Sequence, residues 1–433
     1  MWLSAGMQDP AVSTDPPSRA AFAFIFVTVS LDMLALGVIV PVLPKLVVQF
    51  EGGNIASAAI ITGIFGTVWA AMQFIFSPIL GSLSDRFGRR PVVLLSNFGL
   101  GLDYILMALA PTLGWLFVGR VVSGITSSSY STAAAYIADV TPPDRRASRY
   151  GMLGAAFGLG FVIGPAMGGL LGSVNLRLPF WVAAALSLAN AAYGLMILPE
   201  SLPPDRRARL AAHRILNPFQ PLALLKSNPV IIGFALVAFF NYLAHDSLPS
   251  VFVLYADYRY HWGESMIGIA LAAVGICSTV VSAFLIGKIV NRLGEAKALL
   301  VGLVFGVLGF AIFGLANSGF MFLLGIPVNA LWGLAFPSLQ ALMTRQVGPE
   351  EQGRLQGVIG SVQGITGTLA PLLFTQIFAF AVAKDSQIPG MPYLLASLLV
   401  GVALIFALRA SRRTGAAEQP SPAVSPAGYT VED

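Results

Sequence analysis

The chain has 433 residues, of which 56% are hydrophobic and only 10% are charged, and its mean hydropathy is +0.78. Soluble domains carry charge on about a quarter of their residues, so this composition excludes an ordinary soluble protein. The single cysteine, Cys277, excludes an internal disulfide and a multi-cysteine metal site. The net charge of +5 would suit a nucleic-acid partner, but the distribution of the charges along the chain indicates membrane topology instead.

Apolar runs of about 20 residues recur along the whole chain, and each is long enough to cross the hydrocarbon of a bilayer as a helix. Helices are expected because lipid cannot hydrogen-bond an exposed backbone. We predict an all-α membrane protein with twelve spans, centred near residues 35, 68, 101, 126, 160, 188, 242, 277, 307, 332, 366 and 401.

The polar stretches between these runs predict the domain boundaries. Residues 1–19 have no basic region followed by an apolar core, so they do not resemble a cleavable signal peptide, and the first span is expected to stay as an anchor. The longest polar stretch, 199–228, separates six spans from six. The predicted parts are a tail (1–19), a first bundle (20–198), a central loop (199–228), a second bundle (229–410) and a disordered tail (411–433).

Basic residues gather on one side of this arrangement. Of the 25 Lys and Arg residues, four fall on the side opposite both termini and Arg120 falls within a span, which leaves 20 on the side of the termini. The positive-inside rule therefore places both termini in the cytoplasm. The four residues expected outside are Lys45, Arg177, Arg259 and Lys384.

The first charged motif, "GSLSDRFGRR" (81–90), joins the second span to the third on the cytoplasmic side. Gly88 suits a tight reversal, and Asp85 can accept hydrogen bonds from the N-terminus of a neighbouring helix, whose partial positive charge favours a carboxylate. Such a contact would form in one conformation and break in another, which predicts a gate. The predicted gate residues are Gly81, Asp85, Arg86, Gly88, Arg89, Arg90 and Asp139.

Ionisable residues inside predicted spans form the second set of candidates. A charge at a helix centre costs roughly 2.5–3.5 kcal/mol on insertion scales, so such residues usually have a function or a partner. The set expected to couple protons or bind substrate is Asp32, Asp103, Arg120, His245 and Asp246. Simpler interpretations stay open: carboxyls satisfied by neighbours, an arginine that reaches the interface, and a wet external helix end at His245 and Asp246.

"GLGFVIGPAMGG" (158–169) places small residues at every fourth position around a proline. Small residues let helices approach closely, and the proline permits a bend. The motif residues are Gly160, Gly164, Pro165, Gly168 and Gly169.

The two halves are related by an internal repeat. A shift of 206 positions aligns Gly81 with Gly287, Gly88 with Gly294, and Pro165 with Pro371, among other matches. Two six-helix units with a site at their interface are the plan of the major facilitator transporters. Asp85 aligns with Asn291 and Arg120 with Ile326, so we expect the first half to handle protons and gating.

Polar residues in the spans are candidates for lining a central cavity, although most aromatic and amide groups in membranes simply pack; the candidates are Gln73, Asn241, Ser278 and Gln340. The scattered histidines offer no metal-ligand spacing, and the chain has no P-loop, so neither an enzyme nor an ATP-driven pump is indicated. Energy is expected from an ion gradient or from the substrate's own gradient, with no resident cofactor.

These motifs carry a family resemblance. "GSLSDRFGRRPVVLLS" (81–96) and "GFVIGPAMGG" (160–169) resemble signatures of the major facilitator drug:proton antiporters, and "LDMLALGVIVPVLP" (31–44), "GLDYILMALAP" (101–111) and "GRVVSGIT" (119–126) are similar to the tetracycline efflux class. The resemblance implies exchange of protons for a drug, which in that class is a divalent-metal chelate of tetracycline. It also implies functional carboxylates at Asp32 and Asp103, a gate at Asp85 and Arg89, and a span-four arginine at Arg120.

The second half departs from that class, which has a histidine in span eight where this chain has Ser278 and an aspartate in span nine where it has Gly306. We expect His245 or Asp246 to supply part of the missing function. The predicted protein is a drug exporter of the inner membrane that works as a monomer by alternating access. The alternatives are an exporter of another drug or metabolite, an uptake symporter, and a membrane sensor or scaffold; the span-five motif disfavours uptake.

Overall fold

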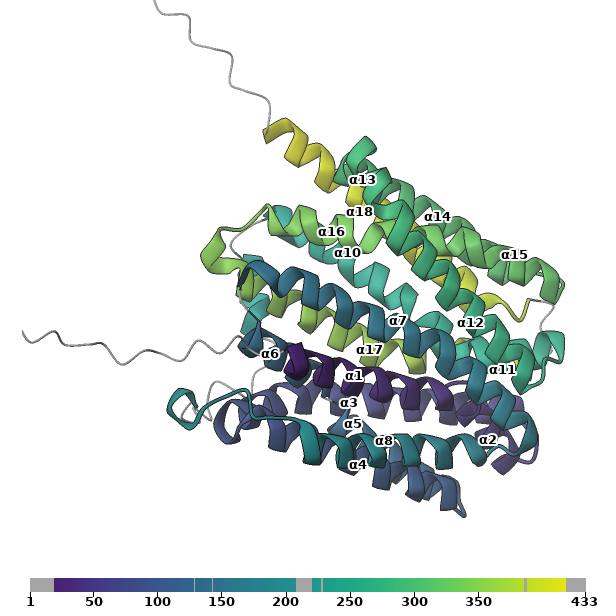
Figure 1. Ribbon diagram of the computed structural model, residues 1–433. Coiled ribbons are helices and arrows are strands. Elements are labelled where there is room, and N and C mark those ends of the chain that lie inside the picture. The colour runs from purple at the N-terminus through teal and green to yellow at the C-terminus, as the bar shows by residue number, and fades with distance from the viewer. Residues whose placement is uncertain are drawn as a thin grey trace, which may run out of the picture.

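The computed structural model describes residues 19–127, 129–141, 143–207, 220–226, 229–384 and 388–417. Every regular element in these ranges is helical. Eleven helical segments are long and apolar enough to cross a membrane, and the shorter Leu113–Thr126 helix is followed two residues later by a second helix, Ser129–Val140. Counted with that pair, the spans number twelve and fall where the sequence predicts them. Figure 1 shows the helices side by side, running roughly in one direction.

The first half contains spans one to six. Its helices are α1 (Arg19–Ile39), α2 (Leu43–Phe50), α3 (Ile55–Phe87), α4 (Arg89–Leu109), α5 (Leu113–Thr126), α6 (Ser129–Val140), α7 (Pro143–Val174) and α8 (Leu178–Ile197). Two short helical turns, η1 (Pro204–Arg206) and η2 (Gln220–Lys226), lie in the central loop.

The second half contains spans seven to twelve. Its elements are α10 (Pro229–His245), α11 (Ser247–Tyr260), α12 (Glu264–Val280), the π-helical η3 (Val281–Leu285), α13 (Ile286–Leu293), α14 (Glu295–Leu315), α15 (Gly319–Ala330), η4 (Leu331–Leu334), α16 (Ala335–Thr344), η5 (Pro349–Glu351), α17 (Gln352–Ala383) and α18 (Met391–Ala417). The tail predicted to be disordered from residue 411 is helical as far as Ala417, because α18 continues past its apolar stretch. The predicted tail residues 1–18 and 418–433 lie outside the described ranges, as do 208–219 and 227–228 of the central loop.

The repeat is visible in the backbone. Gly88 (φ 106°) and Gly294 (φ 77°) are equivalent positions, and each one ends one helix and begins the next. Positive φ is accessible to glycine at little cost, which explains why both copies keep it. Pro165 and Pro371 also correspond, and each lies inside a 32-residue helix, α7 or α17.

Spans one, four, seven and ten are each interrupted near the middle. Span one breaks between Ile39 and Leu43, span four between Thr126 and Ser129, span seven at Asp246, and span ten at η4 (Leu331–Leu334). The breaks correspond under the 206-residue shift, so they are a property of the repeated unit. Discontinuous helices of this kind line the central sites of many transporters.

Close packing joins the halves through two pairs of long helices, α3 with α17 and α7 with α12. Between α7 and α12, a Cβ on Gly268 would lie 3.0 Å from the Cα of Gly169, so the two backbones touch there. Between α3 and α17, a Cβ on Gly66 would lie 2.8 Å from the Pro371 ring. In Figure 1, α7, α12 and α17 lie in the middle of the molecule, where the two bundles meet.

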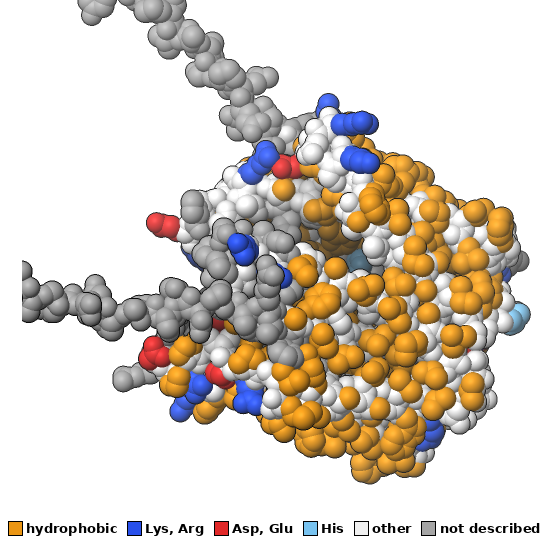
Figure 2. Space-filling view, in the orientation of Figure 1, with side chains coloured by type: hydrophobic (Ala, Val, Ile, Leu, Met, Phe, Trp, Pro, Cys, Tyr) orange, Lys and Arg blue, Asp and Glu red, His pale blue; other side chains and the backbone are white. Residues whose placement is uncertain are grey.

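The halves meet at one end of the molecule and separate at the other. Lys45 of α2 bonds to Asp257 of α11, with Nζ and Oδ1 2.6 Å apart, at the end opposite Gly88. Toward the Gly88 end, a Cβ on Gly81, Gly151 or Gly287 would meet nothing within 4 Å. No residue of α13, at that same end, is buried. The structure is therefore open toward the face that carries Gly88, and Figure 2 shows the face in view hollowed near its middle.

Candidate functional site

Asp32 lies in the core of the first bundle, 5% exposed, on α1. Asn190 of α8 donates to its Oδ1 at 2.9 Å and to the Thr28 carbonyl at 3.0 Å. With the Asn97 amide of α4 oriented to satisfy both its ends, its nitrogen donates to the two Asp32 oxygens at 3.1 and 3.0 Å. Asp32 is thus a buried carboxyl that accepts hydrogen bonds from two amides. This agrees with the alternative of a carboxyl satisfied by its neighbours.

Asp103 and Arg120 lie together on α4 and α5, 2% and 9% exposed. Asp103 interacts electrostatically with Arg120 and has the Ser123 side chain of α5 as a hydrogen-bonding neighbour. The Arg120 guanidinium lies over the Trp69 ring, 5.3 Å from its centroid. A buried arginine with an aromatic and an acidic neighbour is held inside the bundle, which contradicts the alternative of an arginine that reaches the interface.

These two groups belong to one buried network. Tyr104 of α4, 3% exposed, interacts electrostatically with Asp32, Asp103 and Arg120. The three charged residues that the sequence singles out in the first half are thereby brought together around one tyrosine. Asn97, Asn190 and Tyr104 were not predicted; polar residues in otherwise apolar runs are the signal that could have found them.

The predicted gate residues form a second cluster at the Gly88 face. Arg89 pairs with Asp85 four residues earlier, and its Nε donates to Asp139 Oδ2 of α6 at 3.1 Å. Its Nη1 donates to Ser84 at 2.7 Å. Among the other predicted residues, Arg90 donates to the Leu195 carbonyl at 2.6 Å, Arg86 lies over the Phe87 ring, and Gly81 has open space beside it.

The carboxylate at the N-terminus of α4 belongs to Glu200, which is not among the predicted gate residues. The Arg89 backbone N–H donates to Glu200 Oε1 at 2.8 Å, and a Cβ on Gly88 would overlap the Glu200 carboxylate. The predicted contact of Asp85 with a helix N-terminus is therefore not the one present in this open state. Asp85 pairs with Arg89 instead, and its side chain is 48% exposed.

The small residues of α7 serve two helices. Gly160, Gly164 and Gly168 lie against α1 between Met33 and Val38, where side chains would collide with backbone. Gly169 lies against Glu264 and Gly268 of α12 in the other half. Pro165, inside α7, contacts Gly37 and Gly268. The motif thus joins span five to span one within a half and to span eight across the halves.

His245 and Asp246 lie at the break of span seven, in the middle of the apolar segment Val230–Tyr260. Their side chains are 53% and 28% exposed, with His245 Nδ1 3.4 Å from Asp246 Oδ1. The suggestion that they lie near the external end of the span is wrong, because span seven continues through α11 for fourteen further residues. The His245 ring faces Trp332 and Phe336 of span ten, at 5.8 and 5.5 Å.

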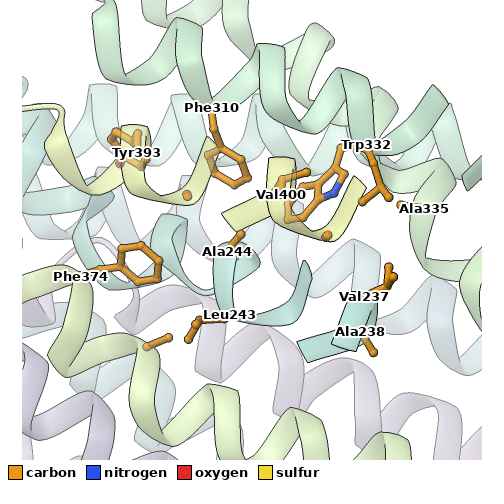
Figure 3. Packing of buried hydrophobic residues seen from close by; sticks show 14 of the residues in the cluster. Val237, Ala238, Leu243, Ala244, Phe310, Trp332, Ala335, Phe374, Tyr393 and Val400 are labelled. Carbon is orange, nitrogen blue, oxygen red and sulfur yellow. The ribbon is translucent and has the colours of Figure 1, made fainter. Parts of the chain in front are cut away.

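The candidate cavity residues divide into three groups. Gln73 donates to the Ser127 carbonyl at the break of span four, at 3.4 Å. Ser278 and Gln340 are exposed. Asn241 is fully buried and accepts from the Trp332 indole at 2.8 Å, so its predicted place on a cavity surface is wrong for this state. Figure 3 shows Trp332 near Phe310 and Val400 in the core of the second half.

Comparison with known proteins decides the family. The sequence profile of the Major Facilitator Superfamily matches residues 25–371 and again 234–426. The chain belongs to the Major Facilitator Superfamily. The predicted fold class, two six-helix bundles of a membrane transporter, is confirmed.

Two relatives cover most of the chain. The class C tetracycline resistance protein of Escherichia coli is 36% identical over 399 residues, which are 92% of this chain and 98% of that protein. The class H protein of Pasteurella multocida is 33% identical over 404 residues, again 92% of this chain and 98% of the relative. The predicted resemblance to the tetracycline efflux class is confirmed, and the chain is a drug-efflux transporter of the superfamily and not an enzyme.

A solved structure supports the fold independently. The bacterial homologue of the human lysosomal transporter Spinster, solved inward-facing and unoccupied, superposes with a TM-score of 0.72 at 17% identity. The alignment covers 95% of this chain and all of that one.

The second half differs from the tetracycline efflux class at Gly306, and the packing around this residue gives a physical reason. A Cβ at position 306 would lie 2.6 Å from Cδ1 of Trp332, closer than real side-chain contacts allow. This protein therefore has no room for a carboxylate at position 306, because the Trp332 indole fills that space.

Proposed function

We propose that the protein exports a drug from the cytoplasm in exchange for protons, as a monomer in the inner membrane with both termini in the cytoplasm. Alternating access would expose a central site first to one face and then to the other. The observation that carries this proposal is the buried network of Asp32, Asp103 and Arg120 in the first bundle. Carboxyls held in apolar surroundings bind and release protons on a change of surroundings, as transport coupling requires.

The gate cluster supports the conformational part. Arg89 connects Asp85, Asp139 and the helix that begins after Gly88, while Glu200 caps that helix from the central loop. Because the open state leaves Asp85 half-exposed, its carboxylate is free to take a second contact when the halves close at this face. Closing would then exchange one set of ion contacts for another at little net cost.

Tetracycline as its magnesium chelate is the first substrate to test, since the relatives named above are tetracycline resistance proteins. Everted membrane vesicles that contain the protein would be energised by respiration, and uptake of magnesium–tetracycline would be followed with and without an uncoupler. We expect uncoupler-sensitive uptake above vesicles that lack the protein. Uptake that an uncoupler does not change would contradict proton coupling.

A second candidate is export of a different drug by the same mechanism. It is favoured by the contact between Gly306 and Trp332 and by Ser278, which leave the second half without two ionisable side chains that the resemblance associates with tetracycline exporters. A panel of drugs and dyes in the same vesicles distinguishes the candidates: uncoupler-sensitive uptake of a dye without uptake of magnesium–tetracycline would favour this one.

A further inference from the structure

The break of span seven places an acidic side chain in the middle of the second bundle. His245 ends α10 and Ser247 begins α11, so Asp246 occupies the interruption. Ala244 and Ser247, which flank the pair His245–Asp246, are fully buried. The side chains of Asp246 and His245 are 28% and 53% exposed. An ionisable pair at this depth is costly unless something compensates it.

The surroundings of Asp246 offer no positive partner except the adjacent histidine. In the part of the chain that the structure describes, no Lys or Arg lies within 4.0 Å of its carboxylate. A Cβ on Gly367 of α17 would lie 3.9 Å from Asp246 Oδ2 and 4.0 Å from the Cβ of Ala70 on α3. The carboxylate thus faces the seam between the halves, which opens toward the Gly88 face.

Aromatic rings pack around His245, the neighbour of this carboxylate, and Tyr242 lies one helical turn before Asp246. Phe336 lies 5.5 Å from the His245 ring, nearly edge-on at 85°, and 5.5 Å from the Tyr242 ring. Trp332 lies 5.3 Å from Phe336, and Asn241 fixes its indole by a hydrogen bond. Phe336 and Tyr242 are partly exposed, whereas Trp332 is buried behind them.

A carboxylate paired with a histidine that packs against a partly exposed aromatic ring matches one ligand chemistry. The faces of aromatic rings attract cations, and a neighbouring carboxylate adds a full negative charge. We propose that Asp246, with Tyr242 and Phe336, binds a lipophilic organic cation, such as a quaternary ammonium or phosphonium group on an aromatic body. The cation would supply the positive partner that Asp246 lacks, and the rings would receive its apolar substituents.

The repeat supports a site specific to the second half. The position equivalent to Asp246 is Val40, at the break of span one, so the first half has an apolar residue where the second half has its carboxylate. The inference rests on the proposed function, since it assigns the cationic part of the cargo to this break.

Binding to the purified full-length protein tests the inference without any ion gradient. Tetraphenylphosphonium and tetraphenylborate have nearly the same shape and opposite charge, so equilibrium dialysis of both separates charge from apolar contact. We expect the wild type to prefer the phosphonium, and Asp246→Asn to weaken phosphonium binding about tenfold while leaving borate binding unchanged. Phe336→Ala should weaken phosphonium binding several-fold.

Matched variants control for damage to the fold. Glu351→Gln removes a carboxylate at the start of α17, away from the break, and should bind as the wild type does. Asp246→Glu retains the charge and should restore most of the binding. Equal binding of the phosphonium to wild type and Asp246→Asn, or no preference over the borate, would overturn the inference. Displacement of the phosphonium by magnesium ion alone would also overturn it, since the site would then take a metal ion.

The two proposals fail separately. If the protein shows no uncoupler-sensitive drug export but still binds the phosphonium in an Asp246-dependent way, the proposed function is overturned and the binding site stands. Uncoupler-sensitive export with no phosphonium binding would overturn the inference alone.

Discussion

Gly88 connects the second and third spans with a backbone conformation that other residues rarely adopt. Its φ of 106° and ψ of 156° lie in a region that is essentially confined to glycine. The Glu200 carboxylate occupies the space that a Cβ would need, in reach of the first N–H of α4. The residue therefore serves both the turn and the contact between the turn and the central loop.

We predict that Gly88→Ala impairs export and lowers the thermal stability of the purified protein. The strained backbone costs about 1–3 kcal/mol, and the added methyl group displaces Glu200 from the helix N-terminus. Drug export and the unfolding temperature measure the two effects. Gly401→Ala is the control, because a Cβ at position 401 meets nothing within 4 Å. Equal export by wild type and Gly88→Ala would contradict this role for Gly88.

The charged members of the first bundle's network were predictable at the residue scale, but their partners were not. Asp32, Asp103 and Arg120 are charges in apolar runs and attract attention in any sequence. Asn97 and Asn190 are neutral, and only the packing of α4 and α8 beside α1 shows that their amides meet Asp32. Sequence spacing within one helix says nothing about such contacts between helices.

At the scale of elements, the repeat was predictable and the helix breaks were not. Recurrent glycines and prolines at one shift predicted the related turns at Gly88 and Gly294 and the related helices α7 and α17. The interruptions of spans one, four, seven and ten fall inside continuous apolar runs, so hydropathy passes over them. For this reason the alternative of a solvated external helix end at His245 and Asp246 stayed open from the sequence, whereas both residues lie in mid-span.

The ends of α2 and α11 form a latch between the halves on the face opposite Gly88. Lys45 bonds to Asp257 at 2.6 Å, donates to the Trp262 carbonyl at 3.2 Å, and lies 4.0 Å from Glu264. Its side chain is only 10% exposed, so the pair is screened less than a surface salt bridge. The latch stabilises the state that is closed on this face.

We predict that Lys45→Ala shifts the population toward the state that is open on the Lys45 face and closed on the Gly88 face. A cysteine at Thr279, which is exposed in the present state, reports the change in a Cys277→Ser background. Its labelling by a membrane-impermeant maleimide added from the Gly88 face should slow about twofold to tenfold, since 1.4 kcal/mol corresponds to a tenfold change in an equilibrium.

Lys384→Ala is the matched control for this experiment. It removes a lysine that follows α17 and lies over the Phe380 ring at 4.8 Å. Labelling at position 279 should match that of the protein with an intact latch. Unchanged labelling in Lys45→Ala as well would show that the latch does not hold the conformation.

At the scale of the whole molecule, composition alone predicted a polytopic membrane protein, and the repeat predicted two six-helix units. The state of the transporter was not predictable, because a sequence that alternates between conformations encodes both. It follows from contacts between the halves, which are close at the Lys45 end and open at the Gly88 end. The asymmetry of charge has a physical basis as well. The first bundle buries Asp32, Asp103 and Arg120, whereas in the second bundle the Asp246 side chain is 28% exposed.

The central claim is that drug export consumes a proton gradient through the buried carboxylates of the first bundle. The most direct measurement is proton release induced by the drug. Everted vesicles are acidified inside by respiration, and a pH-sensitive dye reports the gradient when magnesium–tetracycline, or the drug that the panel identifies, is added. We predict that the drug partly collapses the gradient with the wild type but not with Asp32→Asn or Asp103→Asn, although both variants reach the membrane. A wild-type response from both variants, or no response from the wild type to a drug that it exports, would contradict the account.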